Sequence, residues 1–337
     1  MINTPKRITV LGSGSWGGTI AQLLASKDHH ITAWHIDEKE VQYMLTKHRH
    51  PYIDYLQLSP AIRFTTDLDS TIPGAEILLV AVPSHAVRSL FQRIAHKLET
   101  DTTIVNLTKG IENDTLLTMS QVIREVCSLN AERIVTLYGP SHAEEVAQGL
   151  PTTLVAASTS METATTIQHM FSSPSLRVYT NDDILGVEIA GSVKNVIAIA
   201  AGICDGIGFG DNTKAALLTR GITELTRLGK KMGARPETFY GLSGIGDLIA
   251  TCLSRHSRNR YVGEEIGKGR TLQEVLDGMQ MIAEGVKTAL SVHQLGKKYD
   301  VELPISKAVY EVLFEQKPPR DAVTELMTRN LTKEGNI

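Results

Sequence analysis

Short apolar runs and longer amphipathic segments alternate along the first half of the chain. The runs are rich in Val and Ile and cover residues 8–11, 31–36, 77–82, 103–107, 134–137 and 153–157, and residues 177–179 could add a last strand. Parallel strands need helical crossover connections, so this alternation predicts an α/β fold with a doubly wound, mostly parallel sheet and helices on both faces.

The pattern changes near residue 182, where long helical segments with Gly and Pro breaks replace the strand-like runs. We therefore expect two domains, a sheet domain over residues 1–182 and an all-helical domain over residues 183–337. A chain of 337 residues supplies enough apolar surface for a core in each of them.

One stretch, residues 186–211, is apolar nearly all round if it is wound as a helix, and a helix of that kind is buried. Its interior holds two polar residues, Lys194 and Asn195. A buried ammonium is costly unless it faces a counter-charge or a wet pocket. Small residues share a helical face with Lys194 and leave room for a ligand beside the amine: Ala190, Gly191, Ala198 and Ala201. Alternatively, Lys194 reaches the surface or pairs with a core carboxylate.

Composition and charge exclude several classes of partner. The net charge is -3, from 34 basic and 37 acidic residues without long runs of either sign, which gives no electrostatic footprint for nucleic acid or an anionic membrane. The 3 cysteines are far apart and form no C-x-x-C, so we expect a reducing compartment and no metal or disulfide framework. The start does not resemble a signal peptide, and no uninterrupted apolar stretch is long enough for a membrane span. We expect a soluble, cytoplasmic protein.

The first predicted strand leads into Gly12-Ser13-Gly14-Ser15-Trp16-Gly17, which opens a helix, and a second strand completes a βαβ unit. In that context Gly12, Gly14 and Gly17 allow a tight turn, close approach of the backbone to a pyrophosphate, and close packing of helix on sheet. The helix N-terminus adds amides and a partial positive charge. Residues 1–182 are therefore predicted to be a Rossmann-type dinucleotide-binding domain.

The end of the second strand bears on the choice of dinucleotide. His35 stands where an acidic residue would hold a ribose 2′-hydroxyl, and Asp37 comes slightly late. The basic residues Lys47, His48 and Arg49 follow, so a 2′-phosphate could be tolerated, and NADP or mixed use is favoured over strict use of NAD. Alternatively, His35 is an exposed loop residue.

Ligands of open α/β sheets bind beyond the carboxyl ends of the strands, and two further strand ends carry candidates. Lys109 follows residues 103–107 and precedes the bare backbone of Gly110, so its cation would face the cofactor. Ser141 lies in a tight turn after residues 134–137 and could either line the site or cap the next helix.

The predicted helical domain adds three motifs. Asp247 follows a glycine-rich turn and could be a helix N-cap or could pair with Lys194 and hold it. Residues 254–261 contain three arginines and two serines, a composition that suits a phosphate dianion, although a solvated basic loop is the alternative. Glu284, in residues 281–287, could cap a helix or touch the cofactor.

These motifs, in this order and spacing, resemble the bacterial-type NAD(P)-dependent glycerol-3-phosphate dehydrogenases. The matching segments are GSGSWGG, VAVPSH, NLTKGIE, GPSHAEEVAQGLPT, GSVKNVIAIAAGICDGIGFGDN, GLSGIGDLIATC, SRNRYVG and AEGVKT. The resemblance runs from Ile8 to Leu326. One departure is His142, where the family more usually has an aromatic residue. Others are His35 and Ile36, where relatives often carry arginine or a differently placed histidine.

The resemblance implies reduction of dihydroxyacetone phosphate to sn-glycerol 3-phosphate by hydride transfer from NADPH or NADH, by a homodimer that supplies glycerophospholipid synthesis. It implies that Lys194 is the catalytic acid/base, supported by Lys109 and Asp247. The implied substrate contacts are Lys109, Gly139, Ser141, Lys194, Asp247, Thr251, Ser257, Arg258 and Asn259. The implied cofactor contacts are Gly12, Gly14, Ser15, Trp16, Gly17, His35, Lys109, Ala143, Arg258, Ile282 and Glu284.

Two other functions remain open. A related hydroxyacid or polyol dehydrogenase would share the domain plan but would not depend on a phosphate-binding arginine. A non-catalytic NADP-binding regulator would use only the first domain, and it leaves the charged residues of the second domain unexplained.

Overall fold

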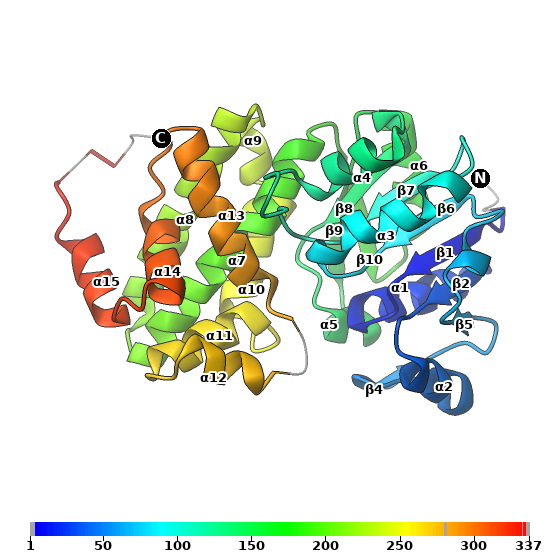
Figure 1. The fold of residues 1–337 in the computed structure, drawn as a ribbon, viewed down its shortest axis with the longest axis horizontal. Helices are drawn as coiled ribbons and strands as arrows, with labels where there is room; N and C mark the ends of the chain where they lie inside the picture. Colours follow the sequence, from blue (N-terminus) through cyan, green and yellow to red (C-terminus); the bar gives the residue numbers. More distant parts are fainter. Residues whose placement is uncertain (1–3, 280–281, 332, 335–337) are drawn as a thin grey trace. The chain divides into compact units, whose positions relative to one another are not determined.

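The computed structural model describes residues 4–279, 282–331 and 333–334 and divides the chain into two compact units (Figure 1). The sheet unit comprises residues 1–108 and 119–184, and the helical unit comprises residues 109–118 and 185–337.

The sheet unit is built on an eight-stranded sheet in the order β10-β9-β8-β7-β6-β1-β2-β5. The strands are β1 (Arg7–Leu11), β2 (His30–Trp34), β5 (Arg63–Thr65), β6 (Ile77–Val80), β7 (Thr103–Asn106), β8 (Ile134–Tyr138), β9 (Thr152–Ala157) and β10 (Leu176–Asn181). Neighbouring strands are parallel except for the antiparallel pair β8 and β9. The predicted doubly wound, mostly parallel sheet is confirmed.

Helices connect these strands and pack on them (Figure 1). They are α1 (Ser15–Ala25), α2 (Glu38–Lys47), α3 (Val87–Ile94), α4 (Met119–Cys127), α5 (Ala143–Ala147) and α6 (Met161–Phe171). The apolar runs of the strands are almost fully buried beneath them, and this burial is the physical source of the pattern in the sequence.

The sequence pattern missed three short strands. They are β5 and the two strands of a small separate sheet, β3 (Arg49–His50) and β4 (Ile53–Gln57). β3 and β5 are only 2 and 3 residues long, and β4 has exposed residues between its buried ones, so none presents a continuous apolar run. β2 ends at Trp34, before the predicted end of the strand, and Ile36 is 80% exposed.

The helical unit is arranged around α7 (Ile184–Ile207), whose residues from Gly186 to Cys204 are all buried. The other helices are α8 (Asp211–Met232), α9 (Pro236–Phe239), α10 (Asp247–Leu253), α11 (Arg258–Gly267), α12 (Leu272–Asp277), α13 (Glu284–Lys298), α14 (Pro304–Phe314) and α15 (Pro319–Met327). Among the described residues α7 alone is long and apolar enough to cross a membrane, but 89% of that apolar window is buried inside the protein. It is therefore a core helix of the unit.

Helices α7 and α11 touch through their backbones. A Cβ atom on Gly202 would lie 1.9 Å from the carbonyl oxygen of Arg260, and one on Gly263 would lie 1.9 Å from that of Ile199. Only glycine permits so close an approach. The crossing fixes the start of α11, with Arg258 and Asn259, against the helix that carries Lys194.

Residues 109–118 leave the sheet unit and pack in the helical unit before the chain returns to form α4. The Ser192 hydroxyl donates to the Gly110 carbonyl at 3.2 Å, and the Ser291 hydroxyl donates to the Ile111 carbonyl at 3.0 Å. The division at residue 182 expected from the sequence counts this segment with the sheet. Its partners lie 82 and 180 positions away, so no local pattern marks the excursion.

Candidate active site

The glycine-rich loop after β1 uses each of its glycines differently. Gly12 has a φ of +97°, a left-handed conformation that favours glycine. A Cβ atom on Gly17 would lie 1.8 Å from the Gly12 carbonyl oxygen, so Gly17 allows α1 to start against the loop. Gly14, the N-cap of α1, has open space where its Cβ would be and supplies no side-chain cap. Ser15 and Trp16 begin the helix, whose first amides have no acceptor within the helix itself.

His35 follows β2 and lies against an acidic residue that the sequence analysis did not select. Its Nε2 is 2.8 Å from Oε2 of Glu40, whereas its Nδ1 is buried and has no hydrogen-bond partner among the described residues. The Tyr52 hydroxyl donates to the same carboxylate, and this hydrogen bond is the main reason why the pKa of Tyr52 rises to about 12. Asp37 is the N-cap of α2 and accepts from the amide of Lys39 at 2.7 Å.

His50, also missed from the sequence, packs beneath the glycine-rich loop. Its Nε2 donates to the Ser13 carbonyl at 3.3 Å, and its Nδ1 accepts from the amide of Tyr52 at 3.2 Å. A Cβ atom on Gly18 would lie 2.6 Å from the imidazole ring. Burial lowers the pKa of His50, so the ring is neutral at neutral pH. No sequence motif predicts this contact, because His50 belongs to the short strand β3 and lies 37 residues from Ser13 in the chain.

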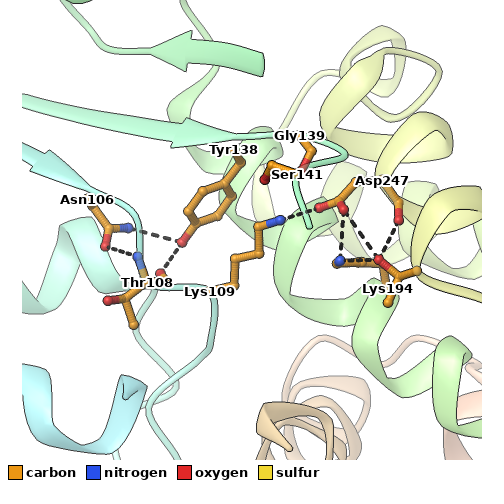
Figure 2. A network of polar contacts seen from close by, with 9 residues as sticks. Asn106, Thr108, Lys109, Tyr138, Gly139, Ser141, Lys194 and Asp247 are labelled. Atoms are coloured by element: carbon orange, nitrogen blue, oxygen red, sulfur yellow. Dashed lines mark hydrogen bonds and ion pairs between the residues drawn. The ribbon is translucent and has the colours of Figure 1, made fainter. Parts of the chain in front are cut away.

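A buried polar network joins the ends of β7 and β8 (Figure 2). The Asn106 side chain accepts from the Thr108 amide at 3.0 Å and donates to the Tyr138 hydroxyl at 3.0 Å. That hydroxyl in turn donates to the Thr108 carbonyl, and the Thr108 hydroxyl donates to the Val82 carbonyl at 2.7 Å. Both polar groups of the Thr108 backbone, the amide and the carbonyl, are thereby hydrogen-bonded. Lys109 follows directly.

The turn after β8 contains the predicted substrate-side residues Gly139 and Ser141. Gly139 has a φ of +147°, and a Cβ atom there would lie 2.8 Å from the Thr153 carbonyl oxygen. The Ser141 hydroxyl donates to the Gly139 carbonyl at 3.0 Å. The N-cap of α5 is His142, so the helix-capping role that was one alternative for Ser141 is wrong. Ala143 is the first residue of α5 and is buried.

The helical unit brings two lysines to one buried carboxylate (Figure 2). Lys194 donates to Oδ1 of Asp247 at 2.8 Å, and Lys109 donates to Oδ2 of the same residue at 2.6 Å. Lys194 also donates to the Thr251 hydroxyl, which donates to the Asp247 carbonyl at 2.7 Å. Lys194 is 5% and Asp247 2% exposed. The three predicted catalytic residues therefore lie in direct contact.

Asp247 reaches this position because of an unusual turn. Residues Leu242–Gly246 form a π-helical turn that runs directly into α10, and such turns are frequent at functional sites. A Cβ atom on Gly244 would lie 2.0 Å from the Phe239 carbonyl oxygen, so the turn depends on glycine. Gly246 is the N-cap of α10. Of the two alternatives for Asp247, pairing with Lys194 is observed and the N-cap role is wrong.

Burial and mutual charge set the protonation of this cluster. Burial lowers the pKa of Lys194 to about 8; Asp247 opposes this shift, and repulsion from Lys109 adds to it. Burial alone would raise the pKa of Asp247, but the two lysines outweigh it and hold that pKa below its usual range. At neutral pH the cluster is a carboxylate between two ammonium groups. The Lys194 proton is more easily released than that of an exposed lysine.

The start of α11 carries the residues predicted to bind phosphate. Ser257 is the N-cap and accepts from the Arg260 amide at 3.2 Å, and Arg258 is the exposed first residue of the helix. Asn259 is only 9% exposed, and its Oδ1 accepts from the amide of Gly285 at 2.8 Å. The Arg260 guanidinium forms an ion pair with Asp205 at 2.7 Å. Arg260 is therefore not part of a solvated basic loop.

The last predicted cofactor motif leads into α13. Ile282 is 40% exposed, and Glu284 is the first residue of the helix, after its N-cap Ala283. The helix-capping alternative for Glu284 is therefore wrong. Met281, with which this motif begins, lies outside the described residues.

Two family models match the chain over nearly its whole length. The model of the NAD-dependent glycerol-3-phosphate dehydrogenase N-terminus matches residues 7–164, and the model of the C-terminus of that enzyme matches residues 183–324. The chain belongs to the NAD-dependent glycerol-3-phosphate dehydrogenase family.

Individual members of this family are similar from end to end. Glycerol-3-phosphate dehydrogenase (NAD(P)+) 2 of Salinibacter ruber is 51% identical over 329 residues, which are 97% of this chain and 96% of the relative. The glycerol-3-phosphate dehydrogenase (NAD(P)+) of Chlorobium phaeobacteroides is 51% identical over 330 residues, 97% of this chain and 99% of the relative. The crystal structure of glycerol-3-phosphate dehydrogenase from Coxiella burnetii, 34% identical, superposes with a TM-score of 0.92 and covers 96% of this chain and 99% of that one.

The predicted family, and with it the predicted Rossmann-type and helical architecture, is thereby confirmed. Within residues 4–279, 282–331 and 333–334, no group of three or more His, Cys, Asp or Glu side chains is placed to hold a metal ion. The described residues of this family member offer a loop of bare backbone and a cluster of a buried amine, a buried carboxylate and a partly buried amine. Such a cluster can deliver and recover a proton in a site shielded from water.

Proposed function

We propose that this chain, as an NAD(P)-dependent glycerol-3-phosphate dehydrogenase, reduces dihydroxyacetone phosphate to sn-glycerol 3-phosphate and catalyses the reverse oxidation. The observation that carries this function is the contact of Lys194, Asp247 and Lys109 in a member of this family. An amine whose pKa is about 8 suits proton transfer in both directions near neutral pH.

The sheet unit fits a dinucleotide. Two features support this. Gly14 leaves open space for a pyrophosphate, and Nδ1 of His35 has no hydrogen-bond partner among the described residues, so we assign it to the ribose. NADPH or NADH supplies the hydride when it is bound. The residues proposed to hold it are Gly12, Gly14, Ser15, Trp16, Gly17, His35, Lys109, Ala143, Arg258, Ile282 and Glu284.

Lys194 is proposed to act as the acid in reduction and as the base in oxidation. As an ammonium, Lys194 stabilises the negative charge that grows on the ketone oxygen and then gives that oxygen a proton. Asp247 keeps the amine charged and in place, and Lys109 adds positive field. In oxidation the neutral amine takes the proton from the hydroxyl group.

The start of α11 is proposed to bind the phosphate group. Arg258 provides charge, and Ser257 and Asn259 provide hydrogen-bonding groups. Gly139, Ser141 and Thr251 are proposed as further substrate contacts. Fixing the phosphate orients the ketone, which is how a remote group contributes to the reaction rate.

The remaining parts of the proposal concern the cell. We propose that the enzyme is a cytoplasmic homodimer and supplies glycerophospholipid synthesis. Sedimentation equilibrium tests the dimer: a mass equal to that of one chain at micromolar concentration would contradict it.

The decisive assay measures oxidation of NADPH and of NADH with dihydroxyacetone phosphate, for the wild type and for Lys194→Ala. We expect turnover by the wild type and a loss in kcat of about 10²- to 10⁴-fold in the variant, the usual contribution of a general acid, with cofactor affinity retained. Lys214→Ala is the matched control, since it breaks a 2.5 Å ion pair with Asp205 in the same unit.

Two outcomes would redirect the proposal. If other phosphorylated or carboxylated ketones were turned over in place of dihydroxyacetone phosphate, the related dehydrogenase would be the better description. If cofactor bound and no ketone were reduced, the regulator would be favoured.

A further inference from the structure

Gly285 is the second residue of α13, and its amide donates to Oδ1 of Asn259 on α11 at 2.8 Å. The first amides of a helix have no acceptor within that helix and need one from elsewhere. Ala283, the N-cap, has no side chain that could serve. The side chain of Asn259 therefore caps a helix other than its own.

This bond decides which way the Asn259 amide faces. The side chain has one oxygen that accepts and one nitrogen that donates two hydrogen bonds. With the oxygen on Gly285, the nitrogen is directed away from α13, and no described residue accepts from it. The opposite orientation would set two donors against each other in a buried place, which is costly. The amide is thus fixed with its donors available to a ligand that has only acceptors, such as a phosphate.

Position 285 has no room for a side chain. A Cβ atom there would lie 2.7 Å from the carbonyl oxygen of Asn195 and 2.8 Å from Oδ1 of Asn259. Asn195 directly follows Lys194 on α7. The start of α13 therefore rests at the same time on the helix that carries the amine and on the amide at the start of α11.

We infer that Gly285 is a positioning residue for phosphate recognition, because its amide orients the Asn259 side chain and its missing side chain lets α13 seat against α7 and α11. This inference rests on the proposed role of Asn259 as a phosphate contact. It adds a residue that need not touch the substrate.

The first test is Gly285→Ala. We expect KM for dihydroxyacetone phosphate and the inhibition constant of inorganic phosphate to rise together, each by about tenfold, as for a binding group moved by a fraction of an ångström. The dissociation constant of NADH should change less than either of these constants, because most of the proposed cofactor contacts lie in the sheet unit. Gly278→Ala is the control, because its Cβ would meet nothing closer than 3.6 Å; both constants should stay at wild-type values.

A double-mutant cycle separates positioning from general loosening of the fold. If Gly285 acts through Asn259, the variant with both Gly285→Ala and Asn259→Ala should bind phosphate no more weakly than Asn259→Ala alone. Independent, multiplying effects of the two substitutions would overturn the inference.

The outcome also separates this inference from the proposed function. If Asn259→Ala leaves KM and phosphate inhibition unchanged, the proposed phosphate contact is wrong, and the inference falls with it. If Asn259→Ala weakens phosphate binding while a folded Gly285→Ala does not, only the inference is overturned.

A second measurement does not require Gly285→Ala to fold. Asn259→Asp keeps an oxygen for the Gly285 amide but replaces the donors with negative charge. We expect hydrogen exchange of that amide to stay slow in Asn259→Asp and to become at least about tenfold faster in Asn259→Ala, with inorganic phosphate binding weakened in both. Equal protection of the Gly285 amide in all three proteins would contradict the orienting bond.

Discussion

The proposed ligand sites of the two units are built in opposite ways. In the sheet unit the glycine-rich loop offers bare backbone. Gly14 leaves open space, Gly12 adopts a left-handed conformation, and Gly17 lets the helix start close against the loop. The proposed catalytic site of the helical unit consists instead of charged side chains. Lys194 and Asp247 are almost fully buried and form a 2.8 Å hydrogen bond. One site is built by omitting side chains, and the other by burying charged ones.

The difference decides how each site tolerates change. A backbone site fails when atoms are added, because added atoms occupy the room of the ligand or of the loop. A buried ionic site fails when one charge is removed, because the remaining charge is left without compensation. The two kinds of substitution therefore have separable signatures in binding, catalysis and stability.

The largest effect is expected for Asp247→Asn. Removing the carboxylate leaves the buried Lys194 beside the partly buried Lys109 without a counter-charge, so we expect kcat/KM for reduction to fall by at least about 100-fold. Breaking a buried pair also lowers the free energy of unfolding by about 3–5 kcal/mol, measured by denaturant titration. Asp205→Asn is the control, since Asp205 also lies between two cations, Lys214 and Arg260. An equal loss of activity in both variants would mean that Asp247 has no special part in the reaction.

The next effect is on the pH dependence of the two reaction directions. In the proposed mechanism oxidation needs a neutral Lys194, whose pKa is about 8, so kcat/KM for oxidation should rise about tenfold per pH unit below pH 8 and level off above it. Reduction needs the ammonium, so kcat/KM for reduction should fall above pH 8. The same lowered pKa makes the free energy of unfolding rise between pH 8 and 10.5, where the unfolded lysine binds more protons. Profiles that move in the same direction would exclude Lys194 as the shared acid and base.

A smaller, two-part effect is expected in the glycine-rich loop. Gly17→Ala places a methyl group against the Gly12 carbonyl and should lower the free energy of unfolding by about 1–3 kcal/mol, as other overpacked sites do. Gly14→Ala meets no atom within 4 Å, so its melting temperature should match that of the wild type, while its Kd for NADH should rise about tenfold. Thermal unfolding and fluorescence titration measure both. Unchanged NADH affinity in Gly14→Ala would place the pyrophosphate elsewhere.

The smallest effect is expected on the choice between NADPH and NADH. The Glu40 carboxylate lies 2.8 Å from Nε2 of His35, so it would oppose the negative charge of a 2′-phosphate bound at His35. Glu40→Gln should lower KM for NADPH a few-fold at low salt and leave KM for NADH unchanged. Glu38→Gln, in the same helical turn, is the control. If neither value changes, Glu40 does not face the 2′ position. The preference for NADPH suggested by Lys47, His48 and Arg49 stays a prediction until then.

The sheet and its glycine-rich loop were predictable because their signals are local. Apolar runs and the spacing of Gly12, Gly14 and Gly17 describe a βαβ unit within a short stretch of chain. Lys194 was predictable for a related reason, since a polar residue inside an apolar helix is a local anomaly. The sequence also offered Asp247 as its partner, as one of two alternatives.

The rest depends on partners far apart in the chain. Lys109 and Asp247 are 138 residues apart, and Asn259 and Gly285 are 26 apart on different helices, so neither pair leaves a periodic trace. Glu40 and Tyr52 meet only because the short strands β3 and β4 turn the chain back. The capping roles considered for Ser141 and Glu284 were wrong because backbone dihedral angles, and not residue preference alone, decide where a helix begins.

The excursion of residues 109–118 has a consequence for biosynthesis. Domains usually fold as they leave the ribosome, the first before the second. Here Lys109 and Gly110 emerge early, while Asp247 and Ser192, to which they bond, belong to residues 185–337 and emerge later. The nascent sheet unit must carry this stretch unpaired until the rest of the chain is translated. A cut at residue 182 would therefore separate residues 109–118 from the unit in which they pack.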